Sequence, residues 1–346
     1  MCNIAGYTGN KQAAPILLEM IRRQEPYDGG MATGIATLHE GKIYTRKIFG
    51  NADRMIHETD ALDLPGTVGI IHTFPGRNSR EEHHHPSLSP DESIALVANG
   101  TMPITRYSAE WDDTAKTLEE EGYSFRYTSE NPQNKSPKLH KSGRFLAGAE
   151  LLCFAAHRYI KQGDTPFEAL AKIGKNVYSD IVTVMVHRDF SDRIFALRTT
   201  RSMYAVMENG ESYLATTPFA FPSELQNQPI SLPVFHPCSL SKNGLEIARE
   251  RIQSEPIEPL TPKLYLKSYL KIEALLKSEK APLYFDELES FLHSEKDLWE
   301  NGRTLTQHAC LVYELLYQLE REGRLKREMR IQKLSYGDRP RWYFSL

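Results

Sequence analysis

The sequence predicts an α+β protein in which two packed β-sheets lie between helices and are followed by a small module of three helices and a β-hairpin. The first observation is the order of the elements in residues 1–253, where strand-like runs flank two amphipathic helices. Such segregation along a chain is typical of packed antiparallel sheets with helices outside them. The second is the proline-rich segment 254–262, which predicts a stiff linker. The third is the change of pattern over 263–346, where apolar residues recur at helical spacing.

The elements of residues 1–253 follow from apolar periodicity and turn residues. Strands are predicted at 2–7, 32–37, 42–48, 67–73, 93–98, 181–186, 193–198, 203–207 and 212–216. Helices are predicted at 14–23, at 147–161 and after Asp164-Thr165-Pro166. The polar stretches 74–91 and 127–144 are predicted to be surface loops.

The composition is that of an ordinary globular protein and argues against several functional classes. Of the 346 residues, 40% are hydrophobic and 25% are charged. The net charge of −3 is not that of a general nucleic-acid or membrane binder. No apolar run approaches membrane-spanning length, and the N-terminus has no signal-peptide pattern. We therefore expect a cytoplasmic protein.

The cysteines and histidines predict neither a disulfide framework nor a metal site. The four cysteines lie far apart without paired spacing, which suits a reducing compartment: Cys2, Cys153, Cys238 and Cys310. His83, His84 and His85 are adjacent, but three neighbouring imidazoles in a loop rarely converge on one ion. We expect a polar loop with a structural His85, no metal and no cofactor.

Two short motifs could together cleave an amide. Cys2 follows the initiator methionine, whose removal would place a thiol nucleophile and a free α-amine, its general base, on one residue. Asn99-Gly100 ends an apolar strand, and an asparagine amide with a following glycine N–H can stabilise an oxyanion. Each motif has a plainer alternative. Cys2 could be a small apolar residue that starts a strand, and Asn-Gly could be a turn.

Five motifs in order make the chain resemble the class II glutamine amidotransferases, which are N-terminal nucleophile hydrolases. The motifs are Cys2-Asn3-Ile4-Ala5-Gly6, Ala32-Thr33-Gly34-Ile35-Ala36, Gly69-Ile70-Ile71-His72-Thr73, His85-Pro86 and Ile94-Ala95-Leu96-Val97-Ala98-Asn99-Gly100. The similarity covers roughly residues 2–240 and is greatest to the glutaminase domain of glucosamine-6-phosphate synthase. It implies a four-layer αββα sandwich, Cys2 as nucleophile, and an oxyanion hole formed by Asn99 and Gly100. It also implies hydrolysis of the glutamine side-chain amide through a thioester.

The chain departs from the family where glutamine would be held. The resemblance assigns substrate binding to the segment of His72, Thr73 and Phe74, but Phe74-Pro75 replaces the arginine and aromatic residue that usually follow His-Thr. Arg77 could replace that arginine, and so could Arg80. Leu146-Ala147-Gly148-Ala149-Glu150 lacks the aspartate expected to hold the α-amine, and Asn3 replaces a usual glycine. We expect His72 to be a buried, supporting histidine.

The C-terminal module, residues 263–346, resembles a winged helix. Thr304-Leu305-Thr306-Gln307 predicts a capping box for its third helix, whose exposed face would carry Glu314, Gln318, Glu320 and Arg321. Basic residues gather in the hairpin and could touch phosphates: Arg324, Lys326, Arg327, Arg330, Lys333, Arg339 and Arg341. A solvated face or a protein contact is the more common use of such a hairpin. Nucleic-acid binding is thus possible but not favoured.

Two functions remain open from the sequence. In the first, the chain is a glutaminase that releases ammonia from glutamine, or a related amide, for a separate partner protein docked on the C-terminal module. About 85 residues after the linker are too few for the synthase domain that relatives carry. In the second, it is a catalytically degenerate amidotransferase domain that senses an amide metabolite and regulates through its winged helix.

Overall fold

Two β-sheets form the centre of the larger, N-terminal part in the computed structural model, which describes residues 2–75, 85–101, 108–129, 141, 143–176, 180–252, 259–279, 281–299, 306–333 and 338–346. The seven-stranded sheet has the order β13 (Ile230–Ser231), β11 (Tyr204–Glu208), β12 (Glu211–Ala215), β1 (Asn3–Thr8), β4 (Val68–Phe74), β2 (Ala32–His39) and β3 (Lys42–Ile48). The six-stranded sheet has the order β15 (Gly244–Ile247), β14 (Cys238–Ser241), β10 (Arg193–Arg198), β9 (Asp180–His187), β6 (Ile94–Thr101) and β5 (Ser87–Leu88). Both are antiparallel throughout their recorded pairs, as predicted.

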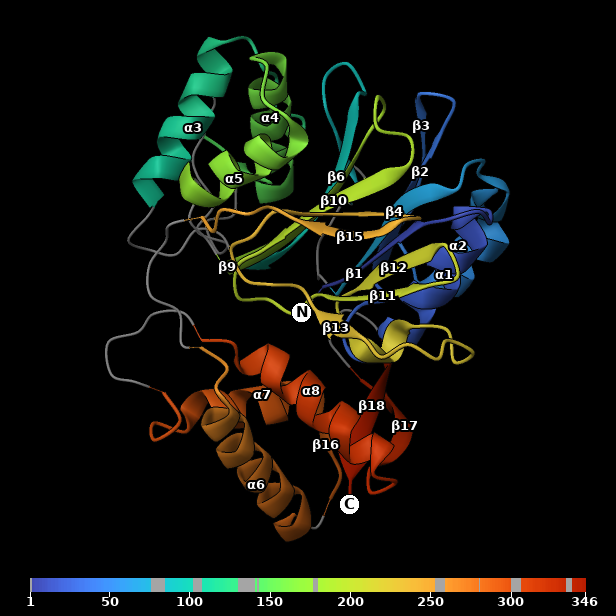
Figure 1. Ribbon diagram of the computed structural model, residues 1–346, viewed down its shortest axis with the longest axis vertical. Helices are drawn as coiled ribbons and strands as arrows, with labels where there is room; N and C mark the ends of the chain where they lie inside the picture. Colours follow the sequence, from blue (N-terminus) through green and yellow to red (C-terminus); the bar gives the residue numbers. More distant parts are fainter. Residues whose placement is uncertain are drawn as a thin grey trace.

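Helices cover the outer face of each sheet, which gives four layers (Figure 1). They are α1 (Ala13–Gln24), α2 (Ala52–Glu58), α3 (Ser108–Glu120), α4 (Gly148–Lys161) and α5 (Pro166–Asn176), with short 3-10 turns at Ala61–Asp63 and Pro218–Ala220. Strand alternation explains the layers. In β1, Ile4 faces the core between the sheets, whereas Ala5 faces the core under α1. In β6, Val97 faces the same inter-sheet core and Leu96 faces the helices on the other side.

The predicted strands and helices of this part are present, and the structure adds others. The helix α3 was not predicted, although Trp111, Ala115 and Leu118 repeat at helical spacing and are fully buried. Strands β13, β14 and β15 and helix α2 were also not predicted. The predicted loop 127–144 is flanked by the short paired strands β7 (Thr128–Ser129) and β8 (Phe145–Leu146), but most of that loop lies outside the described residues.

The C-terminal part contains three helices and a hairpin in the predicted order. They are α6 (Pro262–Ser278), α7 (Phe285–Ser294), α8 (His308–Arg321), β17 (Lys326–Gln332) and β18 (Arg339–Ser345), and a short strand, β16 (Leu283–Tyr284), pairs with β18. Thr304 and Leu305 of the predicted capping box lie outside the described residues, and the helix start that the box predicts is wrong. Helix α8 starts at His308, and Gln307 makes no side-chain cap because its Oε1 accepts a hydrogen bond of 2.5 Å from Arg198. The winged-helix assignment stays a prediction.

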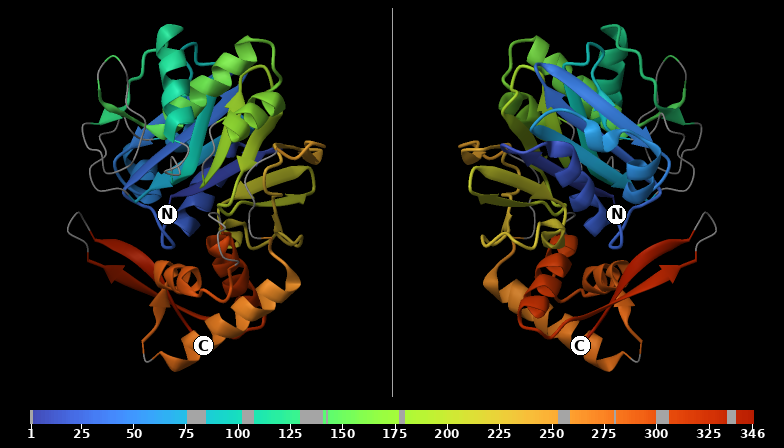
Figure 2. Two further views of the ribbon diagram at one scale, coloured as in Figure 1. Left: turned by 90° about the vertical axis from the view of Figure 1, so that its left-hand side faces the viewer. Right: turned by 90° about the vertical axis from the view of Figure 1, so that its right-hand side faces the viewer.

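The C-terminal part packs directly against the sandwich, as three views show (Figures 1 and 2). Tyr27, which follows α1, is fully buried and lies 5.8 Å from Tyr313 and 6.0 Å from Phe344 between ring centroids. Tyr313 in turn stacks on Phe285 at 4.1 Å. Aromatic burial of this kind is a major source of interface stability. The core under α1 is therefore continuous with the core of the C-terminal part.

Buried ion pairs also join the C-terminal part to the sandwich. They show that two arginines predicted as possible phosphate contacts have a different role. Asp28 lies 2.6 Å from Arg339 and 3.2 Å from Arg341, and the side chains of both arginines are less than a tenth exposed. Both are thus committed to the sandwich, and neither is available to phosphates at a hairpin tip. The predicted exposed face of α8 is also largely wrong, since its members Glu314, Gln318 and Glu320 are half-buried. Within the described part of the chain, no helix is long and apolar enough to cross a membrane.

Candidate active site

Cys2 immediately precedes β1, the strand paired with both β4 and β12 near the middle of the seven-stranded sheet. The N-terminal end of β1 lies at the edge of the sandwich that faces the C-terminal part (Figures 1 and 2). Asn3 is fully buried, and its Nδ2 donates to the carbonyl oxygens of Gln24, at 3.1 Å, and of Asp28. Asn3 thereby anchors the start of β1 to the segment after α1. This is a structural reason for the asparagine beside the cysteine.

The environment of Cys2 favours its neutral thiol. Burial raises the pKa of Cys2 to about 11, and the positive charge of Arg201 only partly opposes this effect. A thiol with such a pKa contains very little thiolate at neutral pH. The residue as a whole is partly accessible. Nucleophilic attack by this sulfur therefore requires a nearby base to remove its proton.

Asn99 and Gly100, at the end of β6, lie beside Cys2 although they come from the other sheet. The Asn99 Nδ2 donates a hydrogen bond of 2.5 Å to the Cys2 carbonyl oxygen. Gly100 has a φ of +139°, and a Cβ atom there would lie 1.9 Å from the Asp180 carbonyl oxygen. Only glycine fits both the conformation and the space. The structure thus brings together the three residues predicted to form the catalytic centre.

The predicted substrate-binding residues lie on the neighbouring strand β4, where two of the three are committed to the fold. His72 is buried and its ring lies 3.9 Å from that of His85, as expected for a supporting histidine. Thr73, paired with Asn3 across the strands, accepts a hydrogen bond of 2.8 Å from the Gly30 N–H. Phe74 follows and is half-buried. Within its described residues, up to Pro75, this strand end offers no formally charged side chain to a substrate.

The remaining predicted candidates either lie outside the described residues or face elsewhere. Arg77, Arg80, His83 and His84 all lie outside them. Glu150 is fully buried and accepts hydrogen bonds of 3.0 Å from the backbone N–H groups of both Arg126 and Tyr127. It is therefore a structural carboxylate. Where the structure describes the chain, no three His, Cys, Asp or Glu side chains gather as metal ligands would.

A charged cluster near Cys2 was missed by sequence analysis. Arg201 Nε lies 2.8 Å from Asp180 Oδ2, and another guanidinium nitrogen lies 3.5 Å from Glu289 Oε1 in the C-terminal part. His308 Nε2 lies 3.2 Å from the same Glu289 oxygen. No local pattern marks these residues, because they come from four separate segments that only the fold brings together.

Comparisons with known proteins agree with this geometry. No protein-family model matches the chain. It is 33% identical over 220 residues to glutamine–fructose-6-phosphate aminotransferase (isomerizing) from Caldanaerobacter subterraneus subsp. tengcongensis, covering 62% of this chain and 31% of the relative. The protein of the same name from Shewanella oneidensis is 26% identical over 222 residues, covering 64% and 32%. The chain thus spans about a third of the length of these curated relatives.

The solved structures give the same result for the fold. Glutamine phosphoribosylpyrophosphate amidotransferase from B. subtilis, complexed with ADP and GMP, superposes with a TM-score of 0.58 over 82% of this chain and 60% of that chain. At 14% identity, this likeness concerns the fold alone. The resemblance to the class II glutamine amidotransferases is confirmed.

Compared with the pattern of the class II amidotransferases that it resembles, this chain keeps the features associated with amide cleavage and changes those expected to hold glutamine. Cys2, Asn99 and Gly100 are together, whereas Phe74 replaces the expected arginine and the stretch Leu146–Glu150 lacks the expected aspartate. The charged groups that the described structure offers near Cys2 are instead those of Arg201 and its partners.

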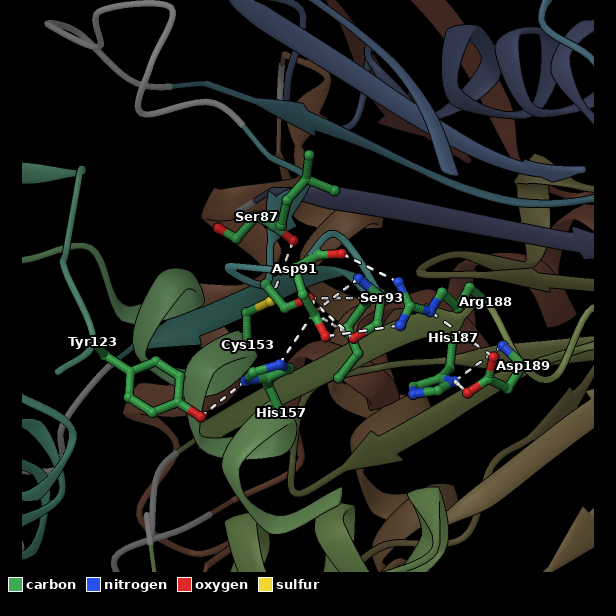
Figure 3. A network of polar contacts seen from close by, with 12 residues as sticks. Ser87, Asp91, Ser93, Tyr123, Cys153, His157, His187, Arg188 and Asp189 are labelled. Carbon is green, nitrogen blue, oxygen red and sulfur yellow. Dashed lines mark hydrogen bonds and ion pairs between the residues drawn. The ribbon is translucent and has the colours of Figure 1, made fainter. Parts of the chain in front are cut away.

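A second polar cluster lies at the opposite end of β6 (Figure 3). His157 of α4 is buried between Asp91, 3.1 Å from its Nε2, and the Tyr123 hydroxyl, 2.8 Å from its Nδ1. Tyr123 and His157 line a cavity of about 600 Å³ between α4 and the segment after α3. Gly100 lies six residues along the extended strand from Ile94 at this end, which corresponds to about 20 Å at roughly 3.3 Å per residue. The cluster is therefore not part of the Cys2 site.

Proposed function

We propose that this protein hydrolyses the side-chain amide of glutamine, or of a closely related amino-acid amide, through a thioester on Cys2. The observation that carries the proposal is the position of Asn99 and Gly100 against Cys2, with Asn99 Nδ2 2.5 Å from the Cys2 carbonyl oxygen. The curated relatives, whose name states that glutamine is their amino donor, support the choice of substrate.

The thiol requires a base, and the α-amine of Cys2 would provide one after removal of Met1. An α-amine titrates near pH 8, whereas burial raises the pKa of the Cys2 thiol to about 11. Transfer of the thiol proton to the amine is therefore uphill, and the amine would act as the base because of its position within the same residue as the sulfur. The thiolate attacks the amide carbon, and the leaving nitrogen takes the proton from the α-ammonium and departs as ammonia.

The second half of the reaction reverses these roles. Water, deprotonated by the α-amine, attacks the thioester carbon, the C–S bond breaks, and the sulfur recovers its proton as the acid is released. In both halves a negative charge develops on the former amide oxygen. The Asn99 side-chain amide and the Gly100 N–H would stabilise that charge. The positive φ of Gly100 lets its backbone approach closely.

The organisation of the chain suggests that the ammonia is used elsewhere. We divide the chain into an amidotransferase-like domain at 1–253, a linker at 254–262 and a winged-helix-like domain at 263–346. The curated relatives are about three times longer than the matched region. The ammonia would pass to a separate ammonia-accepting partner protein in contact with the C-terminal domain.

The test is release of ammonia and glutamate from glutamine by protein whose intact mass confirms loss of Met1. Cys2→Ala should lower the rate by roughly 10⁴-fold or more, as for removal of a nucleophile in other hydrolases. Cys153→Ala is the matched control, because Cys153 is a fully buried thiol of α4 and should not affect the rate. A glutamine-mimicking electrophile should add once, at Cys2.

The lack of the expected arginine, replaced by Phe74, and of the expected aspartate in the stretch Leu146–Glu150 favours a second candidate, a degenerate domain that binds an amide metabolite without cleaving it. Wild-type protein that has lost Met1, binds glutamine in calorimetry and releases no ammonia from any amino-acid amide would establish this candidate and contradict hydrolysis.

A further inference from the structure

The C-terminal part brings a carboxylate to the Cys2 end of the sandwich. Glu289 lies in α7, and its Oε1 is 3.5 Å from the Arg201 guanidinium of the sandwich and 3.2 Å from His308 Nε2 of α8. The three side chains are 16–20% exposed, so the cluster is partly open to solvent. The described contacts of Glu289 are both made by Oε1. Among the described residues, none is recorded as a partner of its second oxygen.

The cluster adjoins the proposed oxyanion hole. In the pairing of β6 with β9, Gly100 is opposite Ile181 and Thr101 is opposite Asp180. Asp180 holds Arg201 at 2.8 Å and also accepts a hydrogen bond from Thr200. Arg201 is thus fixed next to the end of β6, and its charge acts on the Cys2 thiol. A continuous set of contacts leads from Gly100 through Asp180 and Arg201 to Glu289.

The arrangement of charge matches an amino acid. The α-ammonium and α-carboxylate of an amino acid are bonded to the same carbon, so the groups that bind them must be adjacent and of opposite sign. Arg201 and Glu289 have that relation, and an arginine can bind a carboxylate with two parallel hydrogen bonds. We propose that Arg201 binds the α-carboxylate and Glu289 the α-ammonium of the amide substrate, so that the C-terminal part completes the substrate site.

A purely structural use of Glu289 explains less of the structure. The docking of the two parts already rests on the aromatic cluster around Tyr27 and on the buried pairs of Asp28 with Arg339 and Arg341. Burial alone would raise the pKa of Glu289, but the hydrogen bond from His308 and the charge of Arg201 lower it overall. The carboxylate is therefore kept ionised in a partly open position, as an ammonium-binding group must be.

This inference rests on the proposed function, and its test uses substrates that each lack one charge. Glutaramate is glutamine without the α-amine, and 4-aminobutanamide is glutamine without the α-carboxylate. For the wild type, kcat/KM for glutamine should exceed that for either analogue by roughly 100-fold, the discrimination expected when a charged partner is left unpaired. In Glu289→Gln, the preference for glutamine over glutaramate should fall to roughly threefold, because only glutamine loses a contact.

Matched variants separate recognition from structure. Arg201→Lys retains the positive charge beside Asp180 and should selectively reduce the preference for glutamine over 4-aminobutanamide. Glu295→Gln makes the same charge change at the end of α7, where Glu295 pairs with Lys271 within the C-terminal part, and should leave both preferences unchanged. Parallel loss of activity on glutamine and glutaramate in Glu289→Gln would overturn the inference.

Failure of the proposed function would be a different result. In that case the wild type releases no ammonia from any of the three compounds. The same preferences are then measured as dissociation constants by calorimetry. Weaker binding of glutamine, but not of glutaramate, to Glu289→Gln would support the cluster as an amino-acid site without catalysis, and equal changes would reject it.

Discussion

Polar clusters of similar composition lie near the two ends of strand β6. They differ in how many hydrogen-bonding partners the carboxylate of each cluster has. At the start of the strand, His157 lies 3.1 Å from Asp91 (Figure 3). Near its end, His308 lies 3.2 Å from Glu289. Asp91 also accepts hydrogen bonds from the Ser93 N–H at 3.1 Å and from its hydroxyl at 2.7 Å. In contrast, the described contacts of the Glu289 carboxylate, with Arg201 and His308, are both made through its Oε1 atom.

This difference indicates how to distinguish a structural carboxylate–histidine pair from a binding one. The pair at Asp91 is enclosed by its own segment. The Ser89 hydroxyl donates to Asp91 at 3.0 Å, and the second nitrogen of His157 is occupied by Tyr123. Its polar atoms therefore stabilise the turn before β6 against α4. The pair at Glu289 joins two parts of the chain and borders Cys2, which is the position of a group that contacts a ligand.

Among changes within or beside β6, the largest effect is expected from Gly100→Ala at the catalytic end. A Cβ atom would lie 1.9 Å from the Asp180 carbonyl oxygen at a φ of +139°, so the strand end and its N–H must move. Displacing an oxyanion donor costs roughly 10²- to 10³-fold in kcat. We expect a loss of glutamine hydrolysis in that range, measured as ammonia release.

Gly244→Ala is the control for backbone conformation alone. Gly244 has a φ of +114°, and a Cβ atom there meets nothing within 4 Å. This variant should lose about 1 kcal/mol of unfolding free energy, the typical cost of a side chain in a left-handed conformation, and none of its activity. Equal activity of Gly100→Ala and the wild type would remove Gly100 from the catalytic centre.

A smaller effect, on stability and not on catalysis, is expected from Asp91→Ala at the other end of β6. The change leaves Ser89, Ser93 and His157 without their shared acceptor. Because Asp91 is about a third exposed, we expect a loss of roughly 1–3 kcal/mol in urea unfolding, with kcat/KM for glutamine unchanged in the folded protein. A selective rise in KM at unchanged stability would place this cluster in the function and contradict the comparison.

The same contrast explains which parts of the site could be predicted from sequence. Cys2 and Asn99-Gly100 lie within or beside strands that can be recognised from the pattern of neighbouring residues. Amide cleavage also requires a nucleophile such as a cysteine and hydrogen-bond donors such as an asparagine amide, so the residue types themselves point to the function. Arg201 and Glu289 have no such pattern, because their meaning comes from a contact between segments 88 positions apart in the sequence. Arg339 and Arg341 were misjudged for a related reason. Charged residues that alternate along a hairpin are expected to be exposed to solvent. Arg339 and Arg341 are buried because they pair with Asp28 of the sandwich.

The fold was predictable to a similar degree. The longer strands of both sheets could be predicted because a strand buried on both faces has a continuous apolar run, as at Ile181–Val186, whereas the short strands β13, β14 and β15 could not. The C-terminal helices could be predicted from their spacing. The packing of the C-terminal part against the sandwich could not be predicted. In sequence, a residue buried between two parts of the chain, such as Tyr27, looks the same as a residue in the core of one part.

The smallest predicted effect is a pH dependence specific to the Asp91 end. Burial lowers the pKa of His157 below its ordinary value near 6.5, despite the charge of Asp91. The unfolded chain then binds more protons than the folded one below that pH, so the contribution of the neutral His157 is present above about pH 6.5 and is lost as the pH falls. The free energy of unfolding of the wild type should therefore fall more than that of His157→Gln as the pH is lowered from 7.5 to 5. Parallel curves for the two proteins would mean that His157 is equally protonated in both states, and the polar cluster at this end would then have to be open to solvent.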